Sequence, residues 1–167
     1  MKLKRIMPLL ITILILAACS RATMGEVIEK DIPFNVKEII HKERVKKGVI
    51  LLYVTSQKNN QGEFDTVTVA FLKGNDQDGW ENAGHNHWEH EEDNLITVYQ
   101  DVFYDYDHKG HLENRLPVIY GKIESDGIRS VKLYSEDGKL EQAKIIEKKS
   151  GRYYMKIGDY AITKGIK

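Results

Sequence analysis

The sequence predicts a mainly β protein, at the border with α+β, in which antiparallel sheets form a sandwich-like arrangement and one short helix lies near the N-terminus. Two observations support this prediction. Short apolar or alternating segments rich in β-branched residues recur along the chain, and turns containing glycine, asparagine or aspartate separate them. From Leu116 onward, five such segments follow one another at short intervals, which is typical of a meander or of one half of a sandwich.

The first expected element is a helix of one or two turns within residues 27–45. Pro33 stands near its expected start, where proline is tolerated. Four apolar residues of this stretch have the spacing of one helical face: Ile32, Val36, Ile39 and Ile40. The preceding residues 20–26 contain Gly25 and little apolar material, so we expect them to form a flexible tether.

A β-hairpin is expected next. Residues 49–54 are continuously apolar, as in a fully buried strand, and residues 66–72 are β-branched and nearly alternating. A turn at residues 59–62 separates the two segments, so we predict that they pair. Residues 74–79 form a second turn, and the polar stretch 80–92 is expected to be irregular.

Short strands are expected over the second half of the chain. Residues 95–104 alternate as a strand does, whereas the polar residues 105–115 predict a long loop. The dipeptide Asp137-Gly138 is typical of a tight hairpin turn, because glycine accepts a positive φ. Five further strands are expected at residues 118–123, 128–134, 143–147, 153–157 and 161–166.

The N-terminus has the three parts of an export signal. Basic side chains within residues 2–5 form the head, residues 6–16 are apolar apart from Thr12, and small residues follow. Residues 6–18 would make a helix roughly 20 Å long, at about 1.5 Å per residue. A bilayer core is about 30 Å thick, so this segment is short for a permanent span. An ordinary N-terminal membrane anchor is the alternative.

The end of this segment, Leu16-Ala17-Ala18-Cys19, resembles the lipobox of bacterial lipoproteins. In that family a diacylglyceryl group is attached to the cysteine, and a dedicated peptidase cuts directly before it. Cys19 is the only cysteine of the chain and stands where the motif requires it. The resemblance implies a signal peptide of residues 1–18, a lipidated tether of residues 19–26 and an anchor of acyl chains such as palmitate. Two acyl chains hold a protein stably on a membrane.

Lipidation would place the mature chain on the extracytoplasmic face of the cell membrane. Ser20 follows the cysteine, so the aspartate that favours inner-membrane retention in Gram-negative lipoproteins is not at that position. The composition, rich in lysine, isoleucine and asparagine, favours a low-GC Gram-positive organism. Residues 27–167 are expected to form a single β-rich domain, or two halves, 27–115 and 116–167, that share a core.

Composition argues against several classes of partner. Without residues 1–18 the chain has 149 residues, with 22 basic and 25 acidic side chains and a net charge of −3. A nucleic-acid binder would carry a basic patch or a strongly basic balance instead. No further run of 18 apolar residues occurs, so no other membrane span is expected. With its one cysteine acylated the domain has no disulfide, and an apolar core must stabilise it.

The mature part also resembles small uncharacterised lipoproteins of spore-forming Gram-positive bacteria. The resemblance rests on the short motifs Gly79-Trp80, Tyr120-Gly121-Lys122-Ile123 and Ile128-Arg129-Ser130-Val131. It implies a style of fold and a location at the envelope, and it implies no activity.

Histidines make a metal site the main candidate for chemistry, because five of the six lie within residues 85–111. The candidate ligands are His85, His87, His90, His108 and His111. In an extended chain the first two share a face, and in a helix the second and third do. Imidazole ligands would suit a divalent transition metal such as zinc, copper or nickel. The alternative is a solvated turn, because acidic residues flank the tract and its spacing matches no zinc signature.

A catalytic constellation is not recognisable. The only thiol is assigned to lipid, and no serine lies in a Gly-x-Ser-x-Gly elbow. Carboxylates at Glu89, Glu91, Glu92 and Asp93 could serve glycoside cleavage, although such a charge run is usually a solvated face. Several aromatic residues belong either to the core or to a binding groove: Tyr99, Phe103, Tyr104, Tyr106, Tyr153, Tyr154 and Tyr160.

These observations predict a non-enzymatic, lipid-anchored binding or accessory domain at the cell envelope, whose partner is an envelope protein or a cell-wall ligand. The first alternative is a metal-binding lipoprotein that uses the cluster between His85 and His111. The second is an envelope hydrolase, for which the sequence offers the least support.

Overall fold

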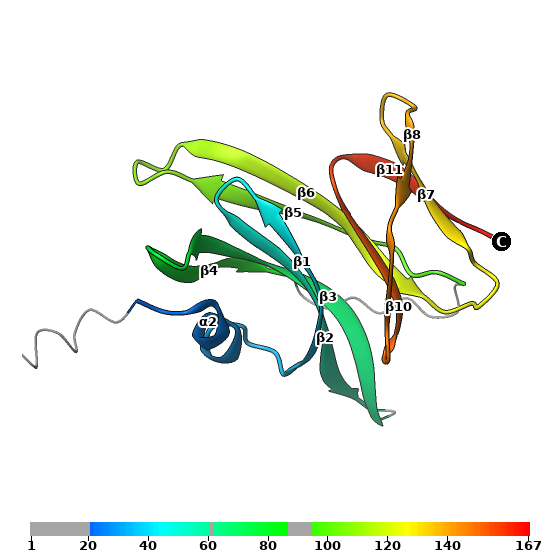
Figure 1. Ribbon diagram of the computed structural model, residues 1–167, viewed down its shortest axis with the longest axis horizontal. Helices are drawn as coiled ribbons and strands as arrows, with labels where there is room; N and C mark the ends of the chain where they lie inside the picture. The colour runs from blue at the N-terminus through cyan, green and yellow to red at the C-terminus, as the bar shows by residue number, and fades with distance from the viewer. Residues whose placement is uncertain (1–20, 61, 87–94) are drawn as a thin grey trace, which may run out of the picture.

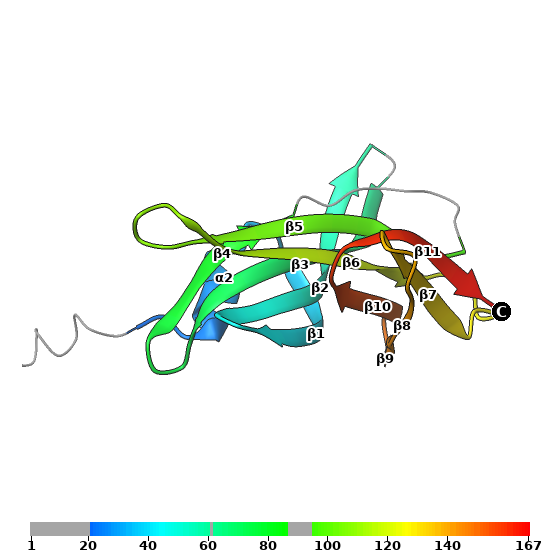
Figure 2. The same ribbon diagram turned by 90° about the horizontal axis from the view of Figure 1, so that it is seen from above.

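The computed structural model describes residues 21–60, 62–86 and 95–167. It confirms a mainly β fold with antiparallel sheets and one short helix. Figures 1 and 2 show an elongated, layered molecule. The first described residues lie at one end of its long axis, and the C-terminus lies at the other.

The first sheet is an antiparallel meander in which each strand pairs with the next one along the chain. Its strands are β1 (Val36–Val45), β2 (Gly48–Asn59), β3 (Gly62–Asn75) and β4 (Gly79–His85). The predicted hairpin is β2 with β3, in which Val49 lies opposite Leu72. Both faces of this pair are covered, which explains why its apolar runs are continuous rather than alternating.

The second and third sheets take up the rest of the chain. The second sheet has the order β5-β6-β10-β9, and the third has the order β11-β7-β8. The strands of the second sheet are β5 (Tyr99–Tyr106), β6 (Leu112–Ile123), β9 (Ile145–Lys148) and β10 (Gly151–Ile157). Those of the third are β7 (Ser130–Ser135), β8 (Leu140–Ala143) and β11 (Tyr160–Ile166). A division of the domain between residues 115 and 116 would fall inside β6.

Apolar contacts hold the layers together in the order helix, first sheet, second sheet, third sheet. The helix α2 (Met24–Lys30) covers the outer face of the first sheet, where Val27 and Trp80 belong to one buried cluster. The inner face packs on the second sheet, and the rings of Phe71 and Phe103 meet there with centroids 6.1 Å apart. The third sheet covers the far face of the second in a separate cluster.

The helix begins earlier than predicted, inside the segment expected to be a flexible tether. Thr23 caps it: the Thr23 hydroxyl accepts a hydrogen bond from the Glu26 amide at 3.2 Å, and the Glu26 carboxylate accepts one from the Thr23 amide at 2.9 Å. The backbone hydrogen bond from Thr23 is the largest cause that lowers the pKa of Glu26. This capping box satisfies two donors of the first helical turn and therefore marks the helix start.

The helix predicted from the spacing of Ile32, Val36, Ile39 and Ile40 is wrong, because α2 ends at Lys30 and residues 36–45 form strand β1. The register of β1 against β2 shifts between Val36 and Glu38 and again between Ile39 and His41. Such bulges break the alternation of a strand, so the apolar residues acquire a spacing that imitates one face of a helix.

Two stretches that were expected to be irregular are instead paired strands. Residues 79–85 form β4, which pairs with β3, so the irregular stretch predicted over 80–92 is wrong as far as residue 85. The long loop predicted over 105–115 shrinks to residues 107–111, because β5 and β6 pair on either side of it. Both errors have one cause: these strands expose one face, so their composition is polar.

A buried ion pair ties the first sheet to the second. Asp105 on β5 has a side chain that is 1% exposed, and its Oδ1 lies 2.5 Å from Nζ of Lys73 on β3. Its Oδ2 lies 3.7 Å from Nζ of Lys47, which also pairs with Glu113 of β6. Because a buried carboxylate needs a cationic partner, this cluster fixes the end of β5 against the first sheet.

Within the part of the chain that the structure describes, no helix is both long and apolar enough to span a bilayer.

Candidate functional site

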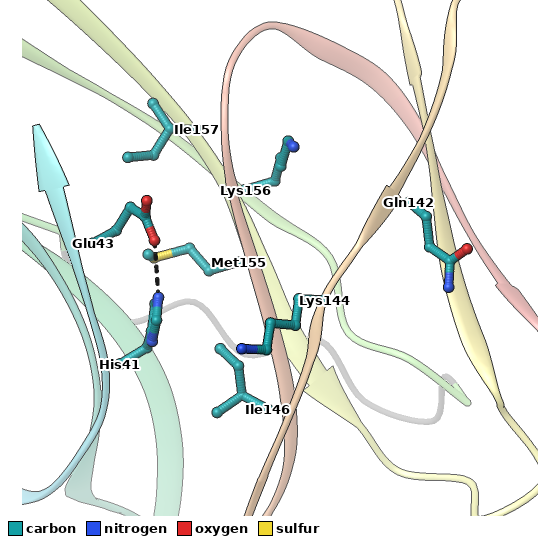
Figure 3. A pocket seen from close by; sticks show the side chains of 8 residues that line it. All are labelled: His41, Glu43, Gln142, Lys144, Ile146, Met155, Lys156 and Ile157. Carbon is teal, nitrogen blue, oxygen red and sulfur yellow. Dashed lines mark hydrogen bonds and ion pairs between the residues drawn. The ribbon is translucent and has the colours of Figure 1, made fainter.

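A cleft of about 370 Å³ opens where the outer strands of the first and second sheets, β1 and β9, come together. Figure 3 shows side chains that enter it from β1, from β10 and from the segment around the β8–β9 junction. The lining residues are His41, Glu43, Gln142, Lys144, Ile146, Met155, Lys156 and Ile157.

The bulge in β1 supplies one wall of the cleft. The register shift between Ile39 and His41 lets Ile40 enter the core, where it is 3% exposed. His41 and Glu43 are two residues apart, and both line the cleft because alternate residues of a strand point to the same side.

Lys144 stands where the chain leaves the third sheet for the second. Ala143 ends β8 and is buried, and Ile145 begins β9, so Lys144 belongs to neither strand and is exposed. The single strand predicted over residues 143–147 is therefore two strands in different sheets. No glycine or proline marks this change of sheet, which is why the sequence did not reveal it.

Most of the charged groups around the cleft are already paired. Nε2 of His41 lies 2.9 Å from Oε2 of Glu43. Nζ of Lys156 lies 3.0 Å from Oε2 of Glu141, which also accepts a hydrogen bond from the Tyr160 hydroxyl at 3.0 Å. The hydrogen bonds from Lys156 and then Tyr160 lower the pKa of Glu141. Burial, followed by the contact with Glu141, raises the pKa of Tyr160 to about 12.

Lys144 is the lysine of the cleft that has no carboxylate partner among the described residues. It makes no ion pair with any residue in the described ranges, and Figure 3 shows its amino group pointing into the cleft. The apolar side chains of Ile146 and Met155 lie beside it, and Ile157 lines the cleft farther away, near Glu43. The eight lining residues include no hydroxyl or thiol, so they offer binding groups rather than a nucleophile. This arrangement suits a ligand with an apolar body and one anionic group.

The predicted metal ligands do not converge in the described part of the molecule. His85 lies at the end of β4, with its Nδ1 3.2 Å from Nδ2 of Asn82 and its ring edge-on to Phe34 at a centroid distance of 5.7 Å. Nδ1 of His111 lies 3.1 Å from Oδ2 of Asp107 in the β5–β6 turn, where His108 is exposed.

No group of three histidine, cysteine, aspartate or glutamate residues that could hold a metal ion occurs within residues 21–60, 62–86 and 95–167. Of the other predicted site residues, Cys19, His87 and His90 lie outside the described residues. The metal site therefore stays a prediction, because the described residues alone do not provide a complete set of ligands.

Burial separates the aromatic residues into two groups. Four of them are core residues, each at most 6% exposed: Tyr99, Phe103, Tyr153 and Tyr154. Tyr104 and Tyr106 are 46% and 51% exposed on the outer face of β5. Tyr160 is partly exposed, and its hydroxyl donates a hydrogen bond to Glu141, which also pairs with the cleft residue Lys156.

The sequence singled out none of the residues that line the cleft, and the sixth histidine, His41, is among them. It lies outside the histidine-rich tract, on a stretch that was predicted to be helical. No motif in the sequence marks it or Lys144, because the cleft forms only when two sheet edges far apart in the sequence meet.

Comparison of the chain with protein-family models, with curated proteins and with solved structures gives no match.

Proposed function

We propose that the chain is a lipoprotein anchored through acyl chains on Cys19 to the extracytoplasmic face of a cell membrane, where its domain binds a ligand and performs no catalysis. The anchoring half of this proposal rests on one observation. The only cysteine of the chain follows Leu16-Ala17-Ala18, at the end of a basic and then apolar leader.

The binding half rests on the cleft between β1 and β9. Its volume falls within the usual range for small-molecule sites, and three apolar residues line it beside five polar or charged ones. Lys144 is the group expected to meet an anionic part of the ligand, because the other lysine of the cleft, Lys156, already has a carboxylate partner.

Anchoring is tested by replacing the cysteine. The unsubstituted chain is expected to fractionate with membranes, to take up labelled fatty acid and to lose residues 1–18. A Cys19→Ser variant should take up no label and should keep its leader. If the unsubstituted chain takes up no fatty acid and is not cut before residue 19, the anchoring half fails.

Binding is tested with an anionic naphthalene-sulfonate dye, which combines an apolar body with one negative charge and fluoresces on apolar surfaces. We expect Lys144→Glu to weaken dye binding about tenfold, because the loss of an attractive charge contact of roughly 1.4 kcal/mol changes the affinity by that factor. Lys149→Glu is the matched control, because Lys149 is also exposed and does not line the cleft. Equal dye affinities for the two variants would contradict a role for the cleft.

A further inference from the structure

The outer face of the β5–β6 hairpin carries an exposed apolar patch. It consists of Tyr104, Tyr106 and Leu112, which are 46%, 51% and 52% exposed. The two tyrosine rings lie together on one strand, with centroids 6.5 Å apart and planes 33° apart, and Leu112 on β6 pairs with Tyr106. We call these three residues the hairpin patch. They are half of the large apolar residues that the described part of the chain exposes.

The start of the described chain is fixed to the turn between β3 and β4. Arg21 donates a hydrogen bond to the Gln77 carbonyl and lies 3.8 Å from Asp78, and the Trp80 amide donates to the Ala22 carbonyl at 3.0 Å. Cys19 precedes Arg21 by two residues in the sequence, so its acyl chains would be attached close to this turn. A lipid on Cys19 would therefore hold this turn close to the membrane.

The hairpin patch lies at the same end of the molecule as that turn. Nζ of Lys73, two residues before the end of β3, donates to the Tyr106 carbonyl at 3.2 Å and pairs with Asp105. Figures 1 and 2 agree that the start of the described chain, the β3–β4 turn and the tip of the β5–β6 hairpin share one end of the long axis. The C-terminus and the third sheet lie toward the other end.

The chemistry of the patch fits the interface of a bilayer. Tyrosine has an apolar ring and a polar hydroxyl, and it is enriched at the level of the lipid headgroups. Lys109 in the adjoining turn is exposed without an ion-pair partner among the described residues, whereas Asp107 is engaged by His111. The tip therefore presents apolar rings and the amino group of Lys109 to the headgroups, and the carboxylate in the same turn, Asp107, is already engaged by His111.

We infer that the hairpin patch rests in the headgroup region of the membrane, as a second contact beside the acyl chains, and that the third sheet points away from the bilayer. The inference rests on the lipidation of Cys19 proposed above. A second contact of this kind fixes the orientation of a domain that acyl chains alone would leave free to tumble.

The test is the accessibility of two introduced cysteines in the full-length acylated protein, reconstituted in phospholipid vesicles. Tyr106→Cys reports on the patch. Leu140→Cys is the matched control, since both positions are 51% exposed and Leu140 lies in the third sheet. Acylation blocks the sulfur of Cys19, so each variant has one reactive thiol. The rate of modification by a membrane-impermeant maleimide is measured and normalised to the rate for the same variant unfolded in urea.

We expect modification of Tyr106→Cys to be at least about tenfold slower than that of Leu140→Cys, because the headgroup region excludes the reagent. Equal rates on protein that floats with the vesicles overturn the inference and leave the lipidation intact. A protein that does not float, and whose Cys19 itself reacts, shows that the lipidation has failed. Fast modification in vesicles but slow modification on intact cells assigns the patch to a protein partner and also overturns the inference.

Discussion

Substitution of Gly121 by alanine tests how the second sheet is assembled. A Cβ at Gly121 would lie 1.9 Å from the Thr97 carbonyl oxygen and 2.8 Å from the Tyr154 hydroxyl. Carbon and oxygen atoms without a covalent bond approach no closer than about 3.3 Å even in favourable contacts, so the segment around Thr97 has to move by more than about 1 Å.

That movement breaks a group of buried hydrogen bonds. The Thr97 amide donates to the Lys122 carbonyl at 2.9 Å, the Lys122 amide donates to the Thr97 hydroxyl at 2.7 Å, and the Tyr154 hydroxyl donates to the Thr97 carbonyl at 2.7 Å. Each is worth about 1 kcal/mol, and a buried group left unpaired costs about 1–3 kcal/mol. We therefore expect Gly121→Ala to lower the free energy of unfolding by about 3 kcal/mol or more.

Urea denaturation of residues 20–167, followed by tryptophan fluorescence to which the buried Trp80 contributes, measures this loss. With a slope of about 2 kcal/mol per molar urea, the midpoint should fall by about 1.5 M. Gly127→Ala is the matched control, because a Cβ at Gly127 would meet nothing nearer than the Ser125 hydroxyl at 3.6 Å. If both variants unfold within about 0.5 kcal/mol of each other, the close crossing of residue 97 over β6 is not a feature of the folded protein.

Three further outcomes follow from the structure. Asp105→Ala should lower the free energy of unfolding by about 3 kcal/mol in the same urea assay, the low end for a broken buried ion pair, because its lysine partners are partly exposed and can reach water. An unchanged midpoint would contradict the ion-pair cluster. The pKa of Glu26 is lowered in the folded state, so its stabilisation of α2 is complete above pH 4.5 and is lost as the pH falls through the lowered value. Hydrogen exchange of the α2 amides should show this loss, and Glu26→Gln should abolish the pH dependence. Elemental analysis of the mature protein should find no stoichiometric transition metal; a metal that is lost when His87 and His90 are both replaced by alanine would support the metal-binding alternative instead.

Much of the fold could be predicted from the sequence where the pattern was local. The hairpin of β2 and β3 was predicted correctly, because a continuous apolar run, a turn and a second β-branched run define it without reference to distant residues. Strand β1 was not, because two bulges give its apolar residues a helix-like spacing. The capping pair Thr23 and Glu26 was the available sign that the helix begins before β1.

The candidate site was not predictable for a different physical reason. The predicted metal ligands are histidines that are close in sequence, yet the three of them that the structure describes, His85, His108 and His111, do not converge. The cleft instead joins His41 of β1 to Lys144, about a hundred residues later, where two sheet edges meet. Sequence spacing carries no information about such a contact between edges.

The short motifs on which the predicted resemblance to small Gram-positive lipoproteins rests occupy structural positions and do not line the cleft. Trp80 is 5% exposed and covers the first sheet, with its indole nitrogen donating to Asp76 at 2.8 Å. Gly121 makes room for residue 97, and Ile128 and Val131 are at most 2% exposed between the second and third sheets. Chains that share only these residues would share the layered core and would remain free to differ at the cleft. We therefore expect a chain with the same motifs to keep the layered core, while its residues at the positions of His41 and Lys144 differ with the ligand that it binds.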